Sequence, residues 1–220
     1  MSWGTMLQQL GTGMLTTLEI FALTLVLAMP LGLLVALGRM SKHTVLRGIV
    51  KVYISIMRGT PLMLQLIVVY FGPYLLFGTQ ISAAYRFPAV IIAFVINYAA
   101  YFAEIFRGGI ESMSPGQYEA AQLLGFSRSQ TFFRIILPQV FRSILPAVTN
   151  EIITLVKDTS LAYAIAVTEM FTIAKQIASQ QASFMPYLAA AVFYYVFNWI
   201  VAGIMEAIEK KMDYTRKNES

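Results

Sequence analysis

The chain has 220 residues, of which 58% are hydrophobic and 12% are charged, and its mean hydropathy is +0.67. A soluble domain carries about twice that charged fraction, so composition excludes an ordinary soluble protein. The formal charge is +5, and there is no cysteine, which excludes disulfides, thiol catalysis and thiolate metal sites.

Five segments are apolar over the roughly 20 residues that a helix needs to cross a bilayer. They lie at about 14 to 38, 60 to 79, 87 to 106, 139 to 160 and 185 to 206. We therefore predict an all-α transmembrane protein whose residues 1–220 form a single domain with five spans. Because five is odd, the two ends of the chain should lie on opposite sides of the membrane.

The basic residues indicate which side is which. One side of the predicted topology collects 13 of the 16 Lys and Arg residues, and Lys and Arg accumulate on the cytoplasmic side. These 13 are Arg39, Lys42, Arg47, Lys51, Arg58, Arg107, Arg128, Arg134, Arg142, Lys210, Lys211, Arg216 and Lys217. The N-terminus is predicted outside and the C-terminus in the cytoplasm. The positive charge is thus a sign of topology, and we expect no nucleic-acid partner.

The junction before the second span carries a basic stripe. Arg47, Lys51 and Arg58 recur at steps of four and seven and so share one helical face. This helix could lie in the cytoplasmic interface or be the inner extension of the second span. It runs into Gly59, Thr60 and Pro61, where we predict a break or kink.

The longest predicted cytoplasmic loop, about 107–138, has the signals of two short helices. Ser114 is a candidate N-cap, with proline at the first helical position and Gln117 at the third, which together match a capping box. Gly125 fits the left-handed position that ends a helix. We therefore predict one helix from Pro115 to Leu124.

The start signal repeats at once. Ser127 and Gln130 predict a second helix from Arg128 to about Leu137. In the first helix Ala120 and Ala121 would let a partner approach closely, with Glu119 as a charged neighbour. A loop with this much local order suggests a docking surface.

At these residues the sequence resembles a known family. Glu119, Ala120, Ala121 and Gly125, followed by Ile135, Leu137 and Pro138, match the EAA loop of bacterial ABC importer permeases. The strings RGTP at 58–61, GQYEAAQLLG at 116–125, LPQ at 137–139 and KDTSLA at 157–162 resemble its polar amino-acid branch. The resemblance covers about residues 12–212.

The resemblance implies a five-span permease of the bacterial inner membrane that moves polar amino acids into the cytoplasm. Two permease copies, identical or related, would form the pore, and an extracytoplasmic binding protein would deliver the amino acid. A cytoplasmic ATPase would bind ATP with magnesium and receive the helix Ser114–Leu124, with Ser114, Gln117, Glu119, Ala120, Ala121 and Gly125 as the coupling residues. The chain has no GxxxxGK[ST] phosphate loop, so we expect it to be no enzyme and to bind no cofactor itself.

Polar groups inside the fourth span are the leading candidates for the substrate site. Glu151 lies near the predicted bilayer midplane, and Asp158 follows two turns later on the same face. Thr154 and Lys157 lie on a neighbouring face, so this helix offers both signs of charge to a zwitterionic amino acid. A carboxylate at this depth favours basic or amide substrates, with cystine still possible.

Other polar residues are weaker candidates. Asn97, Gln65 and Thr60 belong to the second and third spans, where Asn97 and Gln65 could equally hydrogen-bond between helices. Lys157 and Asp158 could hold the fold instead, and Glu104 should pair with Arg107 or with a nearby loop.

Two rival function classes remain. An intramembrane enzyme would need a nucleophile with a base, or a metal cluster, and a chain with no cysteine and one histidine has few means for either. A secondary transporter or channel could use Glu151, but would have no reason for a docking loop.

Overall fold

The structure is a computed structural model that describes residues 2–217, and its regular elements there are all helical. The α-helices are α1 (Trp3–Arg39), α2 (Thr44–Gly59), α3 (Leu62–Phe77), α4 (Arg86–Glu111), α5 (Pro115–Leu123), α6 (Arg128–Gln130), α7 (Leu137–Asp158), α8 (Met170–Gln181) and α9 (Met185–Lys217). Short 3-10 helices lie at η1 (Ala83–Tyr85) and η3 (Thr159–Ile165), and a π-helical turn at η2 (Thr131–Ile136). In the described chain four helical segments are long and apolar enough to cross a membrane, or five with the bent pair α2 and α3. The prediction of an all-α membrane protein is confirmed.

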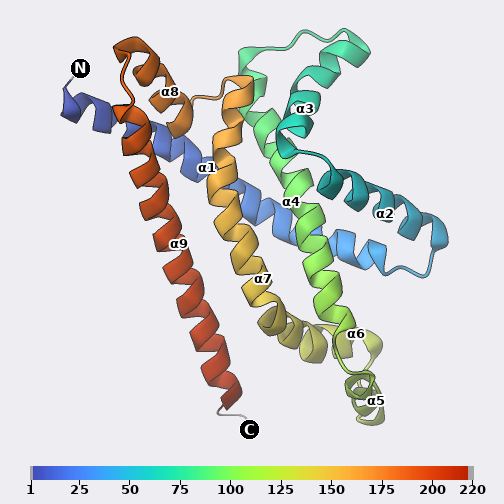
Figure 1. Ribbon diagram of the computed structural model, residues 1–220. Helices are drawn as coiled ribbons and strands as arrows, with labels where there is room; N and C mark the ends of the chain where they lie inside the picture. The colour runs from blue at the N-terminus through green and yellow to red at the C-terminus, as the bar shows by residue number, and fades with distance from the viewer. Residues whose placement is uncertain (1, 218–220) are drawn as a thin grey trace.

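Helix α1 is longer than its predicted span. It begins at Trp3 because Ser2 caps it, accepting a hydrogen bond from the Thr5 backbone N–H. Its 37 residues extend about 55 Å at 1.5 Å per residue, well beyond a roughly 30 Å bilayer core. A helix of that length is expected to tilt, and in Figure 1 it runs obliquely across α4 and α7.

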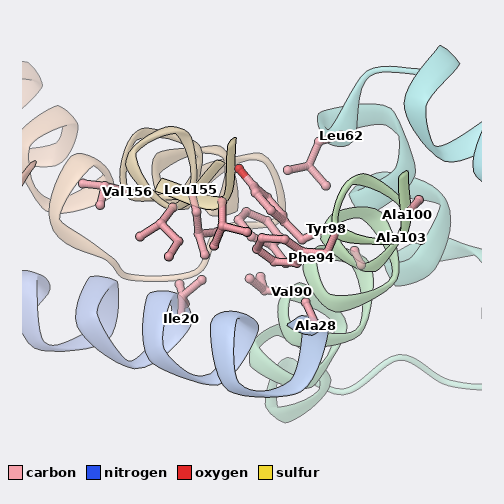
Figure 2. Packing of buried hydrophobic residues seen from close by; sticks show 14 of the residues in the cluster. Ile20, Ala28, Leu62, Val90, Phe94, Tyr98, Ala100, Ala103, Leu155 and Val156 are labelled. Atoms are coloured by element: carbon pink, nitrogen blue, oxygen red, sulfur yellow. The ribbon is translucent and has the colours of Figure 1, made fainter. Parts of the chain in front are cut away.

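Helix α4 is the centre of the bundle and packs most closely on α1. Gly32 of α1 permits this approach, since a Cβ there would lie 2.7 Å from the Phe102 Cβ. In Figure 2, Phe94 and Tyr98 extend from α4 toward Leu155 of α7, and Ile20 of α1 belongs to the same buried cluster. This shared core positions the fourth span against the third.

The predicted break before the second span is present. Helices α2 and α3 meet at an angle of 112° across Thr60 and Pro61, so α2 is not a straight inner extension of α3. Polar side chains fasten the break. Asn97 of α4 donates from Nδ2 to the Met57 carbonyl (3.0 Å) and to Gln65 Oε1 (2.9 Å). Gln65 Nε2 donates in turn to the Met57 carbonyl (2.9 Å).

The first loop helix, α5, begins at Pro115 as predicted and ends one residue before the predicted Leu124, but the predicted side-chain capping bonds at its start are not made. Gly125 adopts a φ of +82°, and the Phe126 N–H donates to the Ala121 carbonyl, which closes a Schellman motif. Ser114 lies at the N-cap without making a side-chain capping bond. Gln117 exchanges two hydrogen bonds with the Gln139 side chain instead (2.8 and 2.7 Å). The capping box predicted there is wrong, because Gln117 fastens α5 to the start of α7.

The second start signal is confirmed, but the helix that it begins is not a separate one. Ser127 and Gln130 make both hydrogen bonds of a capping box. The chain then continues through the π-helical turn directly into α7, so that 128–165 is one helical stretch. Pro138 does not end it, since the chain is helical on both sides of this proline, with the π-helical turn directly before it.

The outer connection between α7 and α9 holds a helix that the sequence did not reveal. Helix α8 begins at Glu169, whose side chain caps it and is fully buried. In Figure 1, α8 lies at the same end of the bundle as the start of α1 and the loop after α3. Helix α5 and the end of α9 lie at the opposite end.

Candidate functional site

A pocket of about 350 Å³ opens where the α2–α3 break faces the fourth span. Its walls come from α3 with the break before it, from α4, and from α7 with η3. The lining residues are Thr60, Pro61, Leu62, Asn97, Tyr98, Tyr101, Glu151, Thr154, Asp158 and Leu161. This pocket thus gathers polar groups from three segments far apart in sequence.

Two carboxylates dominate its charge. Glu151 and Asp158 project from one face of α7, and both are partly buried. Asp158 accepts a hydrogen bond from the Tyr98 hydroxyl (2.7 Å). Glu151 accepts no hydrogen bond from any described residue, so its oxygens are free for a ligand. A buried carboxylate without a partner is costly and points to a binding role.

A series of ion pairs lies along α4, from the pocket toward the last residue of the helix, Glu111. Arg107 donates from Nη2 to Glu104 (2.7 Å) and from Nη1 to Glu111 (2.6 Å), which confirms the pairing predicted for Glu104. Arg58, at the end of α2, lies 3.8 Å from the same Glu104 carboxylate. Its guanidinium also lies over the Tyr101 ring, 5.4 Å from the ring centroid. These ion pairs extend from the pocket wall at Tyr101 to the end of α4, just before α5.

Helix α5 presents an exposed surface at the opposite end of the bundle from α8. Glu119 and Ala120 are exposed, and Leu123 and Leu124 are 89% and 75% exposed. Ala121 is buried against the body of the protein, so of the two predicted contact alanines only Ala120 faces outward. Exposed leucines beside a glutamate form a surface suited to a protein partner.

Residues 28–214 match the family of binding-protein-dependent transport system inner membrane components. The chain belongs to this family. It is 37% identical to the L-cystine transport system permease protein TcyB of Bacillus subtilis over 206 residues, which cover 93% of this chain and 86% of TcyB. It is 36% identical to the arginine transport system permease protein ArtQ of the same organism over 91% of this chain and 90% of that one. A solved amino acid ABC transporter with histidines superposes with a TM-score of 0.84 at 32% identity, over 96% of this chain and 99% of that one.

Within this permease, five of the seven predicted substrate residues line the pocket and two do not. Glu151, Asp158, Thr154, Asn97 and Thr60 are in its wall. Gln65 is turned toward the α2–α3 break, where its amide bonds the chain between Met57 and Thr60. Gln65 and Asn97 thus hydrogen-bond between helices, which was the alternative prediction for them. Asn97 also lines the pocket.

Lys157 is the larger departure. It is exposed and lines a separate pocket of about 300 Å³ with Ser160, Phe171, Tyr187 and Tyr194. The sequence predicted both signs of charge at one site on α7. In the structure Lys157 lies beside the Glu151–Asp158 face of that helix, and its side chain faces α8 and α9. The described pocket around Glu151 therefore has no cation among its lining residues.

Three further residues were missed from sequence. Tyr98 and Tyr101 line the pocket, but in an apolar span a tyrosine carries no signal that separates it from packing aromatics. Glu169 lies outside the spans, where its two oxygens accept four hydrogen bonds. Burial raises the pKa of Glu169, and the bonds from Thr172, Phe171 and Tyr194 oppose that rise. A lone acidic residue before an amphipathic stretch was the available signal.

Among residues 2–212 no group of three His, Cys, Asp or Glu side chains is placed to hold a metal ion. The carboxylates, hydroxyls and amide of the pocket can bind an ammonium or another hydrogen-bond donor.

Proposed function

We propose that this chain is the membrane permease of an ATP-driven importer of polar amino acids, and that the pocket around Glu151 holds the amino acid during transfer. The observation that carries this is the pair of carboxylates within the spans, one of them without a partner. An amino-acid ammonium, or a basic or amide side chain, offers the donors that these oxygens require. The permeases that this chain resembles include ones named for cystine and arginine transport.

We further propose that α5 docks in a cytoplasmic ATP-binding subunit, which binds ATP with magnesium and supplies all hydrolysis. The exposed Leu123 and Leu124 and the neighbouring Glu119 and Ala120 support this assignment. Gln117 supports it differently, because its two bonds to Gln139 tie any movement of α5 to α7, which carries Glu151. Ser114 and Gly125 define the ends of the docking helix.

The remaining partners follow from the same proposal. An extracytoplasmic amino-acid-binding protein delivers substrate at the end of the bundle that carries α8, and a second permease copy, identical or related, completes the pore. The N-terminus lies outside and the C-terminus in the cytoplasm of a bacterial inner membrane. The basic residues support this orientation, since 13 of 16 fall on the predicted cytoplasmic side.

The test is reconstituted uptake. The permease is purified with its ATP-binding subunit and reconstituted in vesicles with ATP inside and the binding protein outside. Radiolabelled L-arginine, L-lysine, L-histidine, L-glutamine and L-cystine are offered in turn. We expect ATP-dependent accumulation of at least one of them. Accumulation that follows an ion gradient without ATP would indicate a secondary transporter instead.

The docking surface has its own test. Leu123→Asp places a charge in the centre of the exposed α5 surface, and we expect it to abolish copurification of the ATP-binding subunit. Ser129→Asp, an exposed position just beyond α5, is the matched control and should leave the complex intact. Retention of the subunit by Leu123→Asp would move the docking site away from α5.

A further inference from the structure

The pocket lined by Glu151 and Asp158, called the acid pocket below, lacks one binding group if its substrate is an amino acid. Every free α-amino acid carries a carboxylate beside its ammonium, and a carboxylate leaving water requires a cation or N–H donors. Glu151 and Asp158 can serve the ammonium, but no lining residue of the described pocket is cationic. Lys157, the cation expected from the sequence, lines a different pocket.

Arg58 is the cation nearest to filling this gap. It ends α2 two residues before Thr60, a lining residue. Its guanidinium lies over the ring of Tyr101, another lining residue, at 5.4 Å from the centroid. The guanidinium is therefore placed at the edge of the pocket and is oriented by an aromatic face.

The Arg58 guanidinium makes an ion pair but no hydrogen bond with the described side chains and backbone. Its contact with Glu104 is 3.8 Å long, which is beyond a hydrogen bond, and among residues 2–212 no acceptor takes a hydrogen bond from it. Its side chain is 45% exposed. Glu104 does not depend on Arg58, because Arg107 binds it with both Nε and Nη2. Beyond its 3.8 Å ion pair with Glu104, the Arg58 guanidinium therefore keeps its five N–H donors available to a ligand.

We propose that Arg58 binds the α-carboxylate of the transported amino acid while Glu151 and Asp158 bind its ammonium or basic side chain. This inference rests on the proposed import of amino acids and adds the residue that recognises what they all share. A planar guanidinium can grip a carboxylate with two parallel hydrogen bonds, which a lysine ammonium cannot do. Arg58 thus selects free amino acids over amines that lack the carboxylate.

The break between α2 and α3 explains why the arginine can reach this place. At this 112° bend the end of α2 lies beside Tyr101 and Glu104 of α4. The bonds from Asn97 and Gln65 to the Met57 carbonyl fix the residue just before Arg58. The amides that hold the break thereby hold the cation in position.

The test compares one amino acid with its decarboxylated amine. The permease with its ATP-binding subunit is placed in lipid nanodiscs without the binding protein, and equilibrium binding is measured by radioligand competition. The ligand is the amino acid accumulated best in the uptake assay, for example L-arginine with agmatine as its amine. In the wild type we expect the amine to bind roughly 10- to 100-fold more weakly, as expected for loss of charge-assisted hydrogen bonds.

Arg58→Gln should remove this preference selectively. We expect the amino acid to weaken by roughly 10- to 100-fold while the amine stays within about threefold of its wild-type affinity. Arg58→Lys, which keeps the charge but loses the fork, should fall between the two. Lys157→Gln is the matched control, because it removes a cation outside the acid pocket, and it should leave both affinities unchanged.

The outcomes separate this inference from the function on which it rests. If the wild type accumulates no amino acid with ATP, the proposed function fails and the inference with it. If uptake is intact but Arg58→Gln weakens the amino acid and the amine equally, or weakens neither, Arg58 does not recognise the carboxylate. A selective loss in Lys157→Gln would assign that role to the lysine and overturn the assignment to Arg58.

Discussion

Two carboxylate environments in this bundle differ in how fully they are satisfied. Glu169 is fully buried, and its oxygens accept bonds from the backbone N–H groups of Phe171 and Thr172, the Thr172 hydroxyl and the Tyr194 hydroxyl. Glu151 is only partly buried and accepts none from the described residues. The oxygens of Glu169 are thus occupied by protein donors, while those of Glu151 can accept hydrogen bonds from a ligand. Partner count, rather than burial, therefore separates a structural carboxylate from one available to a ligand.

The largest expected effect is on the satisfied carboxylate. Glu169→Ala strips the cap from α8 and leaves the Tyr194 hydroxyl and two backbone N–H groups without an acceptor. We expect it to lower the free energy of unfolding by about 3 kcal/mol, measured by thermal unfolding of the purified complex. Glu169→Gln, which keeps one acceptor oxygen, should cost less. An Ala variant as stable as the wild type would remove the structural role.

The open carboxylate should behave in the opposite way. Glu151→Gln removes a charge that no protein donor satisfies, so stability should be unchanged or slightly improved. Amino-acid binding to the complex should weaken by roughly 10- to 100-fold, as measured by equilibrium radioligand binding. Glu19→Gln, at an exposed position on α1, should alter neither quantity. Unchanged affinity in Glu151→Gln would take this residue out of the site.

The smallest effects should come from the tyrosines that serve the two environments. Tyr194→Phe removes one of four donors to Glu169 and should cost about 1 kcal/mol of stability without changing affinity. Tyr98→Phe removes the donor to Asp158, and its main effect should be a change in affinity of a few-fold. Thermal unfolding and ligand binding of the same two samples give both numbers. A change in affinity for Tyr194→Phe together with a loss of stability for Tyr98→Phe would contradict the distinction between the two carboxylates.

Local patterns predicted those parts of the fold that short-range forces decide. The break at Pro61, the left-handed Gly125 and the capping box at Ser127 each depend on a few adjacent residues, and all three are present. The capping box at Ser114 failed for a tertiary reason, because Gln139 offers Gln117 two hydrogen bonds in place of one. Helix α8 was missed because its cap is a glutamate whose donors lie partly on α9.

The sequence by itself determined that this is a helical membrane protein with an ordered helical loop before its fourth span and acidic residues on one face of that span. Hydropathy, charge asymmetry and helical spacing are properties of single segments, so they can be derived from the sequence without knowledge of the fold. Only the tertiary structure decided which cation lies against a wall residue of the pocket around Glu151. Lys157 is six residues from it along the same helix and faces elsewhere, while Arg58 comes from another helix that a 112° bend directs toward the pocket wall. The direction in which a side chain points depends on how helices cross, and no spacing within one helix contains that information.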